Sequence, residues 1–283
     1  MTKNVSWHVV DGFGDEWTRF DQSALPENDR EDLFRLYFGL FPWDKVGQDA
    51  VGFDLGCGSG RWARLVAPRV RELHCIDASA AALEVAKRNL AEMDNCRFHL
   101  ASVDEIPLEE GSADFGYSLG VLHHVPDTRA ALTACVSKLK PGAPFLVYLY
   151  YAFDNRPDWF RLVWRLSECG RVIVSRAPFP IRYCCSQMIA AFLYWPLARF
   201  ARLLEKIGGR VDLLPLSAYR RRSFYVMRTD ALDRFGTRLE HRFTRSKITD
   251  LMENAGLTNI VFSDQEPFWC AIGTKAMPRS GPT

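Results

Sequence analysis

The sequence lacks the features that mark secreted, metal-binding and membrane-spanning proteins. Its eight cysteines include no C-x-x-C pair, and most lie in apolar runs, so we expect buried free thiols in a reducing compartment and no metal site. Residues 1–16 contain no signal-type apolar core, which favours a cytoplasmic location. The longest apolar run, residues 188–198, is shorter than the about 20 residues that a transmembrane helix needs.

The chain also has little net charge, +2 over 283 residues, so it does not as a whole indicate nucleic-acid binding. The charge is unevenly distributed, however. Residues 151–228 contain 14 Lys or Arg and 5 Asp or Glu, a local balance of +9 that leaves −7 for the rest of the chain. This split favours an anionic partner for the basic segment, and a solvated helical face is the equal alternative.

The most informative stretch is Val51-Gly52-Phe53-Asp54-Leu55-Gly56-Cys57-Gly58-Ser59-Gly60. A short apolar strand leads into three glycines at alternate positions, and a helix is expected to start at Arg61. Glycines between a strand and a helix let a ligand approach the backbone closely. Dinucleotide folds use the spacing G-x-G-x-x-G, whereas an acid lies inside this motif. An acid suits a ligand with positive charge and would repel phosphates.

Strands and helices alternate along residues 46–150 and again near the end of the chain. We expect strands at 51–55, 72–76, 96–100, 113–118, 144–150, 257–263 and 268–273. Helices are expected between them at 79–93, 128–139 and 245–255. Repeated strand–helix–strand units predict a doubly wound sheet with ligands at the carboxyl ends of its strands. The expected fold is therefore α/β and Rossmann-like, with seven strands.

These patterns divide the chain into four parts. Residues 1–45 are aromatic and acidic, with helical spacing at 29–40, and are predicted to cap the core formed by residues 46–150. Residues 151–238 break the alternation after the fifth strand and are predicted to be a basic helical insertion, a lid or a homodimer interface. Residues 239–283 complete the sheet and end in a tail. Helices are expected in the insertion at 160–166 and 188–204.

Four sequence blocks occur in the order typical of class I S-adenosyl-L-methionine (SAM) methyltransferases. They are residues 54–60, 76–79, 119–126 and 139–142. One glycine block is weak evidence, but four in register are strong. The chain resembles this family over about residues 46–150 and 239–274, most closely the subgroup that includes the ubiquinone and menaquinone biosynthesis methyltransferases. The resemblance implies SAM as cofactor and methyl transfer as activity, without a metal, because the sulfonium already activates the methyl group.

The resemblance also assigns the cofactor site. Gly56, Gly58 and Gly60 would bring backbone groups against the methionine part of SAM, and Asp54 would orient the loop near the ammonium group. Asp77 ends the second strand, where an acid can accept bonds from both ribose hydroxyls. Their neighbours Cys57 and Ala78 complete this part of the expected site.

The expected adenine site departs from the family pattern. Ser102 stands where the related pattern has an aspartate, so the adenine contact would come from Ser102, the backbone of Val103, or Asp104. Gly120, at the end of the fourth strand, would allow close approach to the bound cofactor.

Three residues are candidates for catalysis. His123 and His124 could take a proton from a nucleophile at neutral pH, and Tyr151 follows the fifth strand at the same edge of the sheet. The alternative is that the histidine pair belongs to the fold and that one of the two bonds a backbone carbonyl. Alignment of nucleophile, methyl group and sulfur in a dry pocket could then suffice.

The acceptor site is expected above the fourth and fifth strands, under the cap and the insertion. Its candidates are Trp17, Tyr150, Tyr219, Arg220, Arg222 and Tyr225. Arginine binds carboxylate or phosphate bidentately and aromatic rings can stack, so we expect an anionic, partly apolar metabolite or glycan precursor of small or medium size, methylated on oxygen or nitrogen. The alternative is that these arginines pair with acids elsewhere in the chain.

Three other functions stay open. One is a SAM-using cyclase or lyase. A second, an RNA methyltransferase, is disfavoured by the low net charge and by the lack of an Asn-Pro-Pro-Tyr-type motif. The third is a membrane-surface protein with a vestigial SAM site, because residues 188–206 combine an apolar face with Arg199, Arg202 and Lys206. A buried lid helix is the favoured interpretation of that segment.

Overall fold

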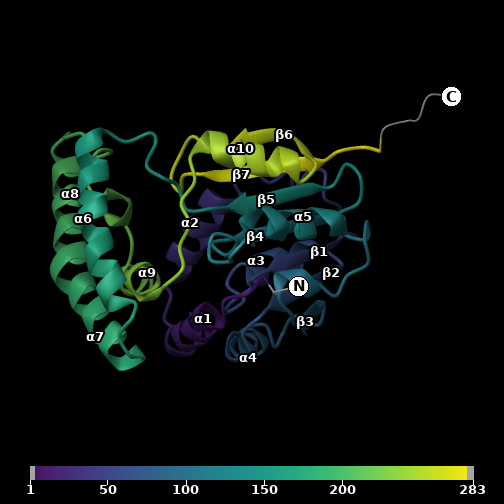
Figure 1. The fold of residues 1–283 in the computed structure, drawn as a ribbon, viewed down its shortest axis with the longest axis horizontal. Helices are drawn as coiled ribbons and strands as arrows, with labels where there is room; N and C mark the ends of the chain where they lie inside the picture. Colours follow the sequence, from purple (N-terminus) through teal and green to yellow (C-terminus); the bar gives the residue numbers. More distant parts are fainter. Residues whose placement is uncertain (1–3, 279–283) are drawn as a thin grey trace.

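A seven-stranded sheet lies at the centre of the computed structural model, which describes residues 4–278 (Figure 1). The strand order is β3-β2-β1-β4-β5-β7-β6. The strands are β1 Val51–Leu55, β2 Glu72–Asp77, β3 Cys96–Leu100, β4 Phe115–Leu119, β5 Pro144–Tyr148, β6 Leu257–Phe262 and β7 Cys270–Lys275. Pairings among β1 to β5 are parallel, whereas β7 runs antiparallel to β5 and β6. The sheet confirms the predicted Rossmann-like fold.

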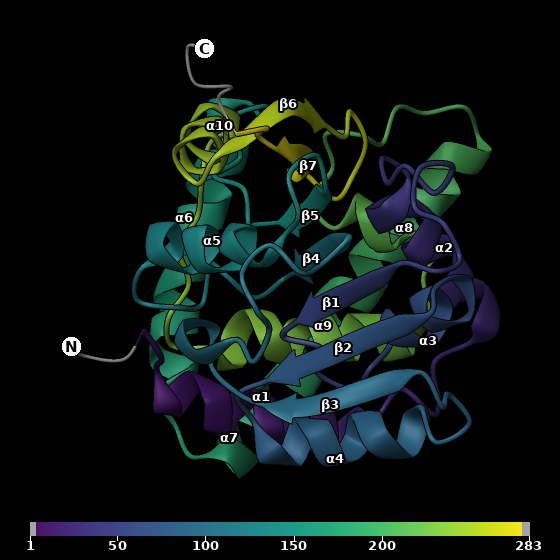
Figure 2. The same ribbon diagram turned by 90° about the vertical axis from the view of Figure 1, so that its right-hand side faces the viewer.

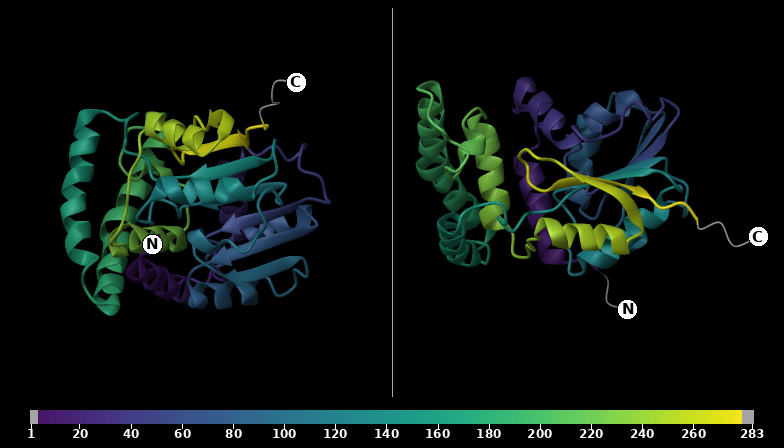
Figure 3. Two further views of the ribbon diagram at one scale, coloured as in Figure 1. Left: turned by 45° about the vertical axis from the view of Figure 1, so that its right-hand side comes forward. Right: turned by 90° about the horizontal axis from the view of Figure 1, so that it is seen from above.

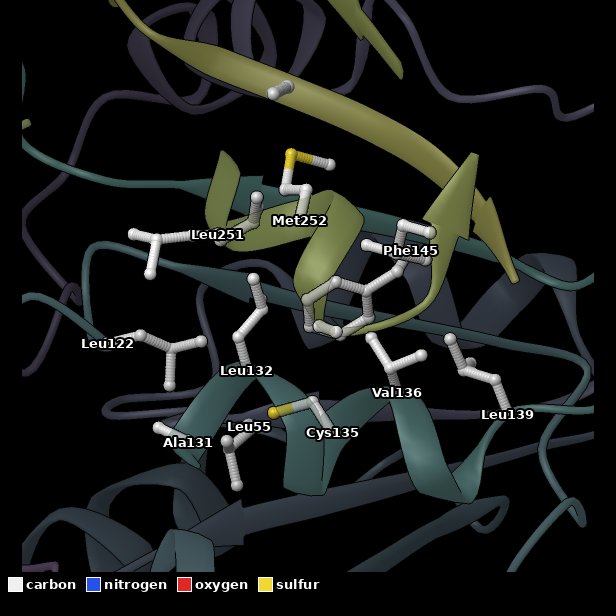
Figure 4. Packing of buried hydrophobic residues seen from close by; sticks show 14 of the residues in the cluster. Leu55, Leu122, Ala131, Leu132, Cys135, Val136, Leu139, Phe145, Leu251 and Met252 are labelled. Carbon is white, nitrogen blue, oxygen red and sulfur yellow. The ribbon is translucent and has the colours of Figure 1, made fainter. Parts of the chain in front are cut away.

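Helices cover both faces of the sheet (Figure 2). One face packs against α2 Glu27–Phe38, α3 Ala63–Val66 and α4 Ala80–Asn89, and the other against α5 Thr128–Lys138 and α10 Arg245–Asn254. Successive strand residues point to opposite faces, so Phe145 packs toward α5 and α10 while Leu146 packs on the other side. In Figure 4, Leu132 and Val136 of α5 point toward Phe145, with Met252 of α10 above them.

Residues 151–238 form an outer layer beyond the carboxyl ends of the parallel strands (Figure 3). This layer contains α6 Asp158–Val174, α7 Phe179–Ile189, a π-helical turn at Ala190–Tyr194, α8 Trp195–Lys206 and α9 Phe224–Gly236. Its own small core is made of Ala190, Tyr194, Ala198, Met227, Ala231 and Phe235. Within residues 4–278, no helix has the length and apolar character needed to cross a bilayer.

Several helices differ from the predictions: α6 is longer than the predicted 160–166, and α7 and α9 were not predicted. The helix predicted over 188–204 is interrupted by the π-helical turn, because Pro196 has no N–H to continue the regular bonding pattern. Helix α1, Trp7–Arg19, was not predicted; Gly12 and Gly14 lower its helix propensity, and packing against α4 and α9 stabilises it instead.

Cysteine burial also differs between core and insertion. Five free cysteines, Cys57, Cys75, Cys96, Cys135 and Cys270, are buried, as the apolar runs around them indicated. Cys169 and Cys184 lie exposed on the insertion, contrary to the expectation of buried thiols.

Candidate active site

A cavity of about 630 Å³ lies between the strand ends, α1 and the insertion. On the sheet side it is lined by Gly56, Cys57, Asp77, Ala78 and Gly120, and on the other side by residues of α6, α8 and α9. Most of the lining is apolar, with a small number of charged and hydroxyl groups. A concave, mainly apolar space with a few convergent polar groups is the expected form of a small-molecule site.

The glycine loop after β1 is held in shape by the residues that cover it. Gly56 and Gly58 have φ angles of +76° and +54°, in the left-handed region that favours glycine. A Cβ on Gly58 would lie 2.8 Å from the indole of Trp17, and one on Gly56 would lie 2.3 Å from Val121. Trp17, expected at the acceptor, therefore packs directly on the cofactor loop as well as lining the cavity. Helix α1 thus closes this side of the site.

Asp77 connects the loop to the start of α4. Its Oδ2 accepts a hydrogen bond from the Gly58 amide at 2.9 Å, and its Oδ1 accepts one from the Ser79 amide at 2.8 Å. Burial raises the pKa of this carboxyl group above its ordinary value. Asp77 also lines the cavity, and each carboxylate oxygen keeps a lone pair for a ligand hydroxyl.

Three cofactor candidates within residues 54–60, Asp54, Gly58 and Gly60, are not part of the cavity lining. Asp54 is 1% exposed, and neither of its oxygens has a hydrogen-bond partner among the described residues. Burial raises the pKa of Asp54 to about 8, so the carboxyl group is neutral at neutral pH. Gly60 faces Leu90, the residue that follows α4. These residues lie behind the loop and shape it.

The adenine side contains a buried hydroxyl without a partner. Ser102 and Val103 line the cavity, and the Ser102 Oγ has no hydrogen-bond partner within residues 4–278. Asp104 is outside the lining, and its carboxylate accepts a bond from the Asn4 amide instead. The Asn4 side chain also donates to the Asp127 carbonyl at 2.7 Å, which fixes the N-terminal segment over this end. An orphaned hydroxyl facing a cavity fits an adenine amino group.

His124 is the histidine that reaches the cavity. Its Nδ1 donates to the Leu239 carbonyl at 2.7 Å, which leaves Nε2 as an acceptor with no hydrogen-bond partner in the described chain. Burial lowers the pKa of His124 to about 4, so the ring is neutral at neutral pH. His123 is fully buried outside the lining and stacks on Tyr150 at a centroid distance of 3.8 Å.

Four acids that the sequence analysis did not assign to the site face the same space: Glu16 of α1, Asp230 and Asp233 of α9, and Glu266, which pairs with Arg156. The Tyr150 hydroxyl donates to Asp233 Oδ2, and the Tyr219 hydroxyl donates to Asp230 Oδ2 at 2.8 Å. Asp233 Oδ1 lies 3.8 Å from His124 Nε2. Burial raises the pKa of both aspartates to about 6. The i, i+3 spacing of Asp230 and Asp233 places both on one face of a helix, but the sequence analysis could not use it because α9 was not predicted.

Arg220 and Arg222, the arginines predicted for the acceptor site, are paired with acids. Arg220 lies outside the cavity lining, with its Nε 2.9 Å from Glu205. Arg222 lines the cavity but lies 3.7 Å from Asp29 and 3.5 Å from Asp32 of α2. The alternative that these arginines pair with acids elsewhere in the chain therefore describes their positions. These contacts attach the insertion to the N-terminal cap.

The tyrosines predicted for the acceptor site, together with the catalytic candidate Tyr151, fall into two groups. Tyr150, Tyr151 and Tyr219 line the cavity. Tyr225 does not, and its hydroxyl accepts a bond from the Gln22 amide at 2.9 Å. The Tyr151 hydroxyl lies 3.5 Å from Arg156 Nε.

Arg61 is the cavity-lining arginine for which the described part of the chain supplies no ion pair. Its guanidinium lies over the rings of Trp62 and Trp17, at 4.4 Å and 5.6 Å from the centroids. Glu16, next to Trp17, supplies an acid beside the same loop. Burial raises the pKa of Glu16 well above its ordinary value, so this pair offers one cation and a carboxyl group that can hydrogen-bond to a free amino-acid end.

The fold, the glycine loop, Asp77 and the orphaned Ser102 hydroxyl are those expected of a class I SAM-dependent methyltransferase domain. Residues 53–147 match the family model for a methyltransferase domain, and this match covers the loop and the strands that carry the cofactor residues. SAM is therefore the cofactor of this domain.

Two curated relatives share this region. The chain is 38% identical over 91 residues to a ubiquinone biosynthesis O-methyltransferase of Alkalilimnicola ehrlichii, covering 31% of this chain and 37% of that protein. It is 32% identical over 128 residues to phosphoethanolamine N-methyltransferase 2 of Caenorhabditis elegans, covering 44% of this chain and 28% of that protein. The matches thus span well under half the length of these relatives.

The fold extends further than the sequence similarity. A solved complex between the Haloferax volcanii Trm112 methyltransferase activator and a methyltransferase contains a chain that matches this one with a TM-score of 0.57. The match covers 95% of this chain and 98% of that chain at 15% identity, which shows a shared fold.

Proposed function

We propose that the protein is an enzyme that transfers the methyl group of SAM to an oxygen or nitrogen nucleophile of a small or medium-sized molecule. One observation carries this proposal: the cavity that Asp77 and Ser102 line on one side also receives His124, Tyr150 and Asp233 on the other. A cofactor site and a set of polar groups able to position a nucleophile therefore face the same space.

The residues on the sheet side fit SAM. Asp77 would accept bonds from the ribose hydroxyls, Ser102 and the Val103 backbone would contact the adenine, and Arg61 with Glu16 would bind the amino-acid end. Bound SAM supplies an electrophilic methyl group on a sulfonium. The remaining tasks of the chain are to exclude water, orient the acceptor and take its proton.

Asp233 is the proposed proton acceptor. Its Oδ2 is held by the Tyr150 hydroxyl, while its Oδ1 has no hydrogen-bond partner within residues 4–278 and can receive the acceptor's proton. A pKa of about 6 suits a base at neutral pH better than the pKa of about 4 of His124. His124 Nε2 can instead accept a hydrogen bond that aligns the nucleophile. Alignment in a dry cavity can account for about 7–11 kcal/mol of a barrier.

The charge of the acceptor has less support than the reaction. An anionic acceptor was expected from the arginines of the insertion, but Arg220 and Arg222 are paired with acids. An acceptor carboxylate or phosphate in the cavity would have Arg61 as its cationic partner. We therefore propose an acceptor that is mainly apolar, with a nucleophilic hydroxyl or amine directed at Asp233.

The proposal is tested by product analysis. The purified protein is incubated with SAM and a panel of phenols, alcohols, amines and carboxylates, and the cofactor products are identified by mass spectrometry. Formation of S-adenosylhomocysteine together with a methylated acceptor is the expected result, and it should be lost in Asp77→Ala. Formation of methylthioadenosine would instead establish cyclase-type chemistry and overturn methyl transfer.

A further inference from the structure

Exposed apolar side chains are concentrated on one part of the molecule. Of the 19 large hydrophobic residues exposed among the described residues, 14 lie between Trp159 and Leu213, on the outer helices of the insertion. Leu166 of α6 is 66% exposed, and Leu203 of α8 is 59% exposed. The sequence favoured a buried lid helix for 188–206, and these exposures show that its outer face is not covered. Contiguous apolar surface on a soluble chain marks an interaction site.

Helix α6 has two different apolar faces. Phe160 and Trp164 line the cavity, whereas Leu162 and Leu166, also one turn apart, are exposed. The first face is explained by the cavity. The second has no partner within residues 4–278.

Helix α8 and the turn before it repeat this arrangement. Tyr194 and Leu197 line the cavity, whereas Phe200, Leu203 and Ile207 follow at helical spacing and are exposed by 53%, 59% and 73%. The outer faces of both helices lie on the side of the molecule away from the sheet (Figure 1).

The charges on these helices indicate what binds there. Arg165, Arg202, Lys206 and Arg210 are exposed, and no ion pair involves them in the described part of the chain. Exposed Trp159 and Trp195 add rings that suit the boundary between water and lipid headgroups. Cations beside exposed apolar side chains are complementary to an anionic lipid surface. Two copies of this face packed together would bring like charges into contact, which disfavours a homodimer here.

The cavity opens toward the same surface. Val163 of α6 and Leu193 of the π-helical turn both line the cavity, yet they are 48% and 47% exposed. They stand on opposite helices, so the opening between α6 and α8 is bordered by apolar side chains on both sides. An apolar molecule could pass from a lipid phase into the cavity along this border without crossing bulk water.

We propose that the outer faces of α6 and α8 dock on an anionic membrane surface and that an amphiphilic acceptor enters the cavity between them. The docking is independent of the chemistry at the site, whereas the entry route rests on the proposed methyl transfer. The helices would lie in the interface rather than span the bilayer, since no helix within residues 4–278 is suited to crossing it.

Docking is tested by co-sedimentation of the full chain with vesicles of phosphatidylcholine alone or mixed with phosphatidylglycerol. We expect binding to the mixed vesicles, weakened by salt, and little binding to phosphatidylcholine alone. Leu166→Glu and Leu203→Glu should each lower binding by about tenfold or more, because a charge replaces an inserted apolar group. The matched control is Val261→Glu on edge strand β6, 51% exposed and remote from the insertion, which should bind like the unmodified chain.

Two further measurements distinguish loss of membrane binding from unfolding and from self-association. Calorimetry with S-adenosylhomocysteine should give the same affinity in all three variants, which separates loss of docking from loss of the fold or of the cofactor site. Light scattering measures self-association. Absence of binding to mixed vesicles, or equal loss in Val261→Glu, would overturn the proposal. A dimer that Leu166→Glu dissociates, with no vesicle binding, would assign the face to a second copy of the chain.

Discussion

The core and the insertion contribute to the same cavity in different ways. The core, residues 46–150, offers backbone groups of a glycine loop and one acid, Asp77, held by two backbone amides. The insertion, residues 151–238, offers side chains: buried aspartates paired with tyrosines on the inside, and apolar and basic groups on the outside. Backbone geometry suits a cofactor that many enzymes share, whereas side chains can vary with the acceptor and the surroundings. We therefore propose that the core binds the cofactor and that the insertion positions the acceptor.

The largest expected effect tests the core half of this comparison. Asp77→Ala removes a carboxylate that can bind both ribose hydroxyls, and hydrogen bonds to charged groups contribute about 1.5–3 kcal/mol each, so the affinity for S-adenosylhomocysteine should fall by about 100-fold or more. Calorimetry measures it. Asp104→Ala is the control, because Asp104 lies outside the cavity lining, and its affinity should stay close to that of the unmodified chain. Unchanged affinity in Asp77→Ala would move the cofactor site elsewhere.

The insertion half is tested at Asp233. Asp233→Asn keeps the size of the side chain but removes the proton acceptor, so kcat should fall by about 10²–10⁴-fold while cofactor affinity is retained. Steady-state kinetics with the acceptor found in the product analysis, together with calorimetry, separates the two effects. Asp230→Asn, on the same face of α9, should change KM more than kcat. Equal kcat in Asp233→Asn and the unmodified enzyme would restrict the insertion to binding.

Asp54, predicted to orient the cofactor loop, should also make the stability of the fold depend on pH. Its pKa is raised from an ordinary value of 3.8 to about 8, so the folded state retains a proton that the unfolded state releases. The resulting stabilisation is complete below about pH 4 and is lost as the pH rises to about 8, by about 1.4 kcal/mol per pH unit. Asp54→Asn should remove this dependence. Urea unfolding of both chains between pH 5 and pH 8 measures the difference in slope, and parallel curves would contradict the assignment.

The smallest expected effect concerns the arginines of the insertion. Arg220 is partly exposed and paired with Glu205, and such pairs contribute about 0–1 kcal/mol, so Arg220→Ala should change the free energy of unfolding by no more than that. It should leave the KM of the acceptor unchanged, because Arg220 is not part of the cavity lining. A large rise in KM would show that Arg220 contributes to acceptor binding. It would also contradict the division of roles proposed for core and insertion.

The sequence predicted the core well because its signals are local. A strand, a glycine turn and a helix start are adjacent in the chain, and left-handed φ angles at Gly56 and Gly58 require the residue type that the motif shows. The strand alternation also predicted the seven-stranded sheet. Helix boundaries in the insertion were less accurate, because amphipathic spacing there reflects two apolar faces on each of α6 and α8 instead of one.

A local sequence pattern does not predict which distant residues a side chain will contact, as Asp54, Asp233 and Arg222 show. Asp54 lies in the motif but faces the interior, behind the loop. Asp233 lies in no motif, yet α9 brings it within 3.8 Å of His124, more than 100 positions away in the chain. Arg222 belongs to a basic cluster that favoured an anion site, but acids of α2 lie beside it. Each outcome depends on partners supplied by distant segments.

The sequence by itself determined the sheet, the glycine loop and the cofactor class, because these depend on backbone conformation and on neighbouring residues. Only the tertiary structure decided which acids reach the cavity, which arginines are neutralised and which apolar faces stay exposed. The physical reason is that burial and pairing are properties of packed elements. The pKa of a carboxyl group and the exposure of a leucine are set by whichever segments fold against them.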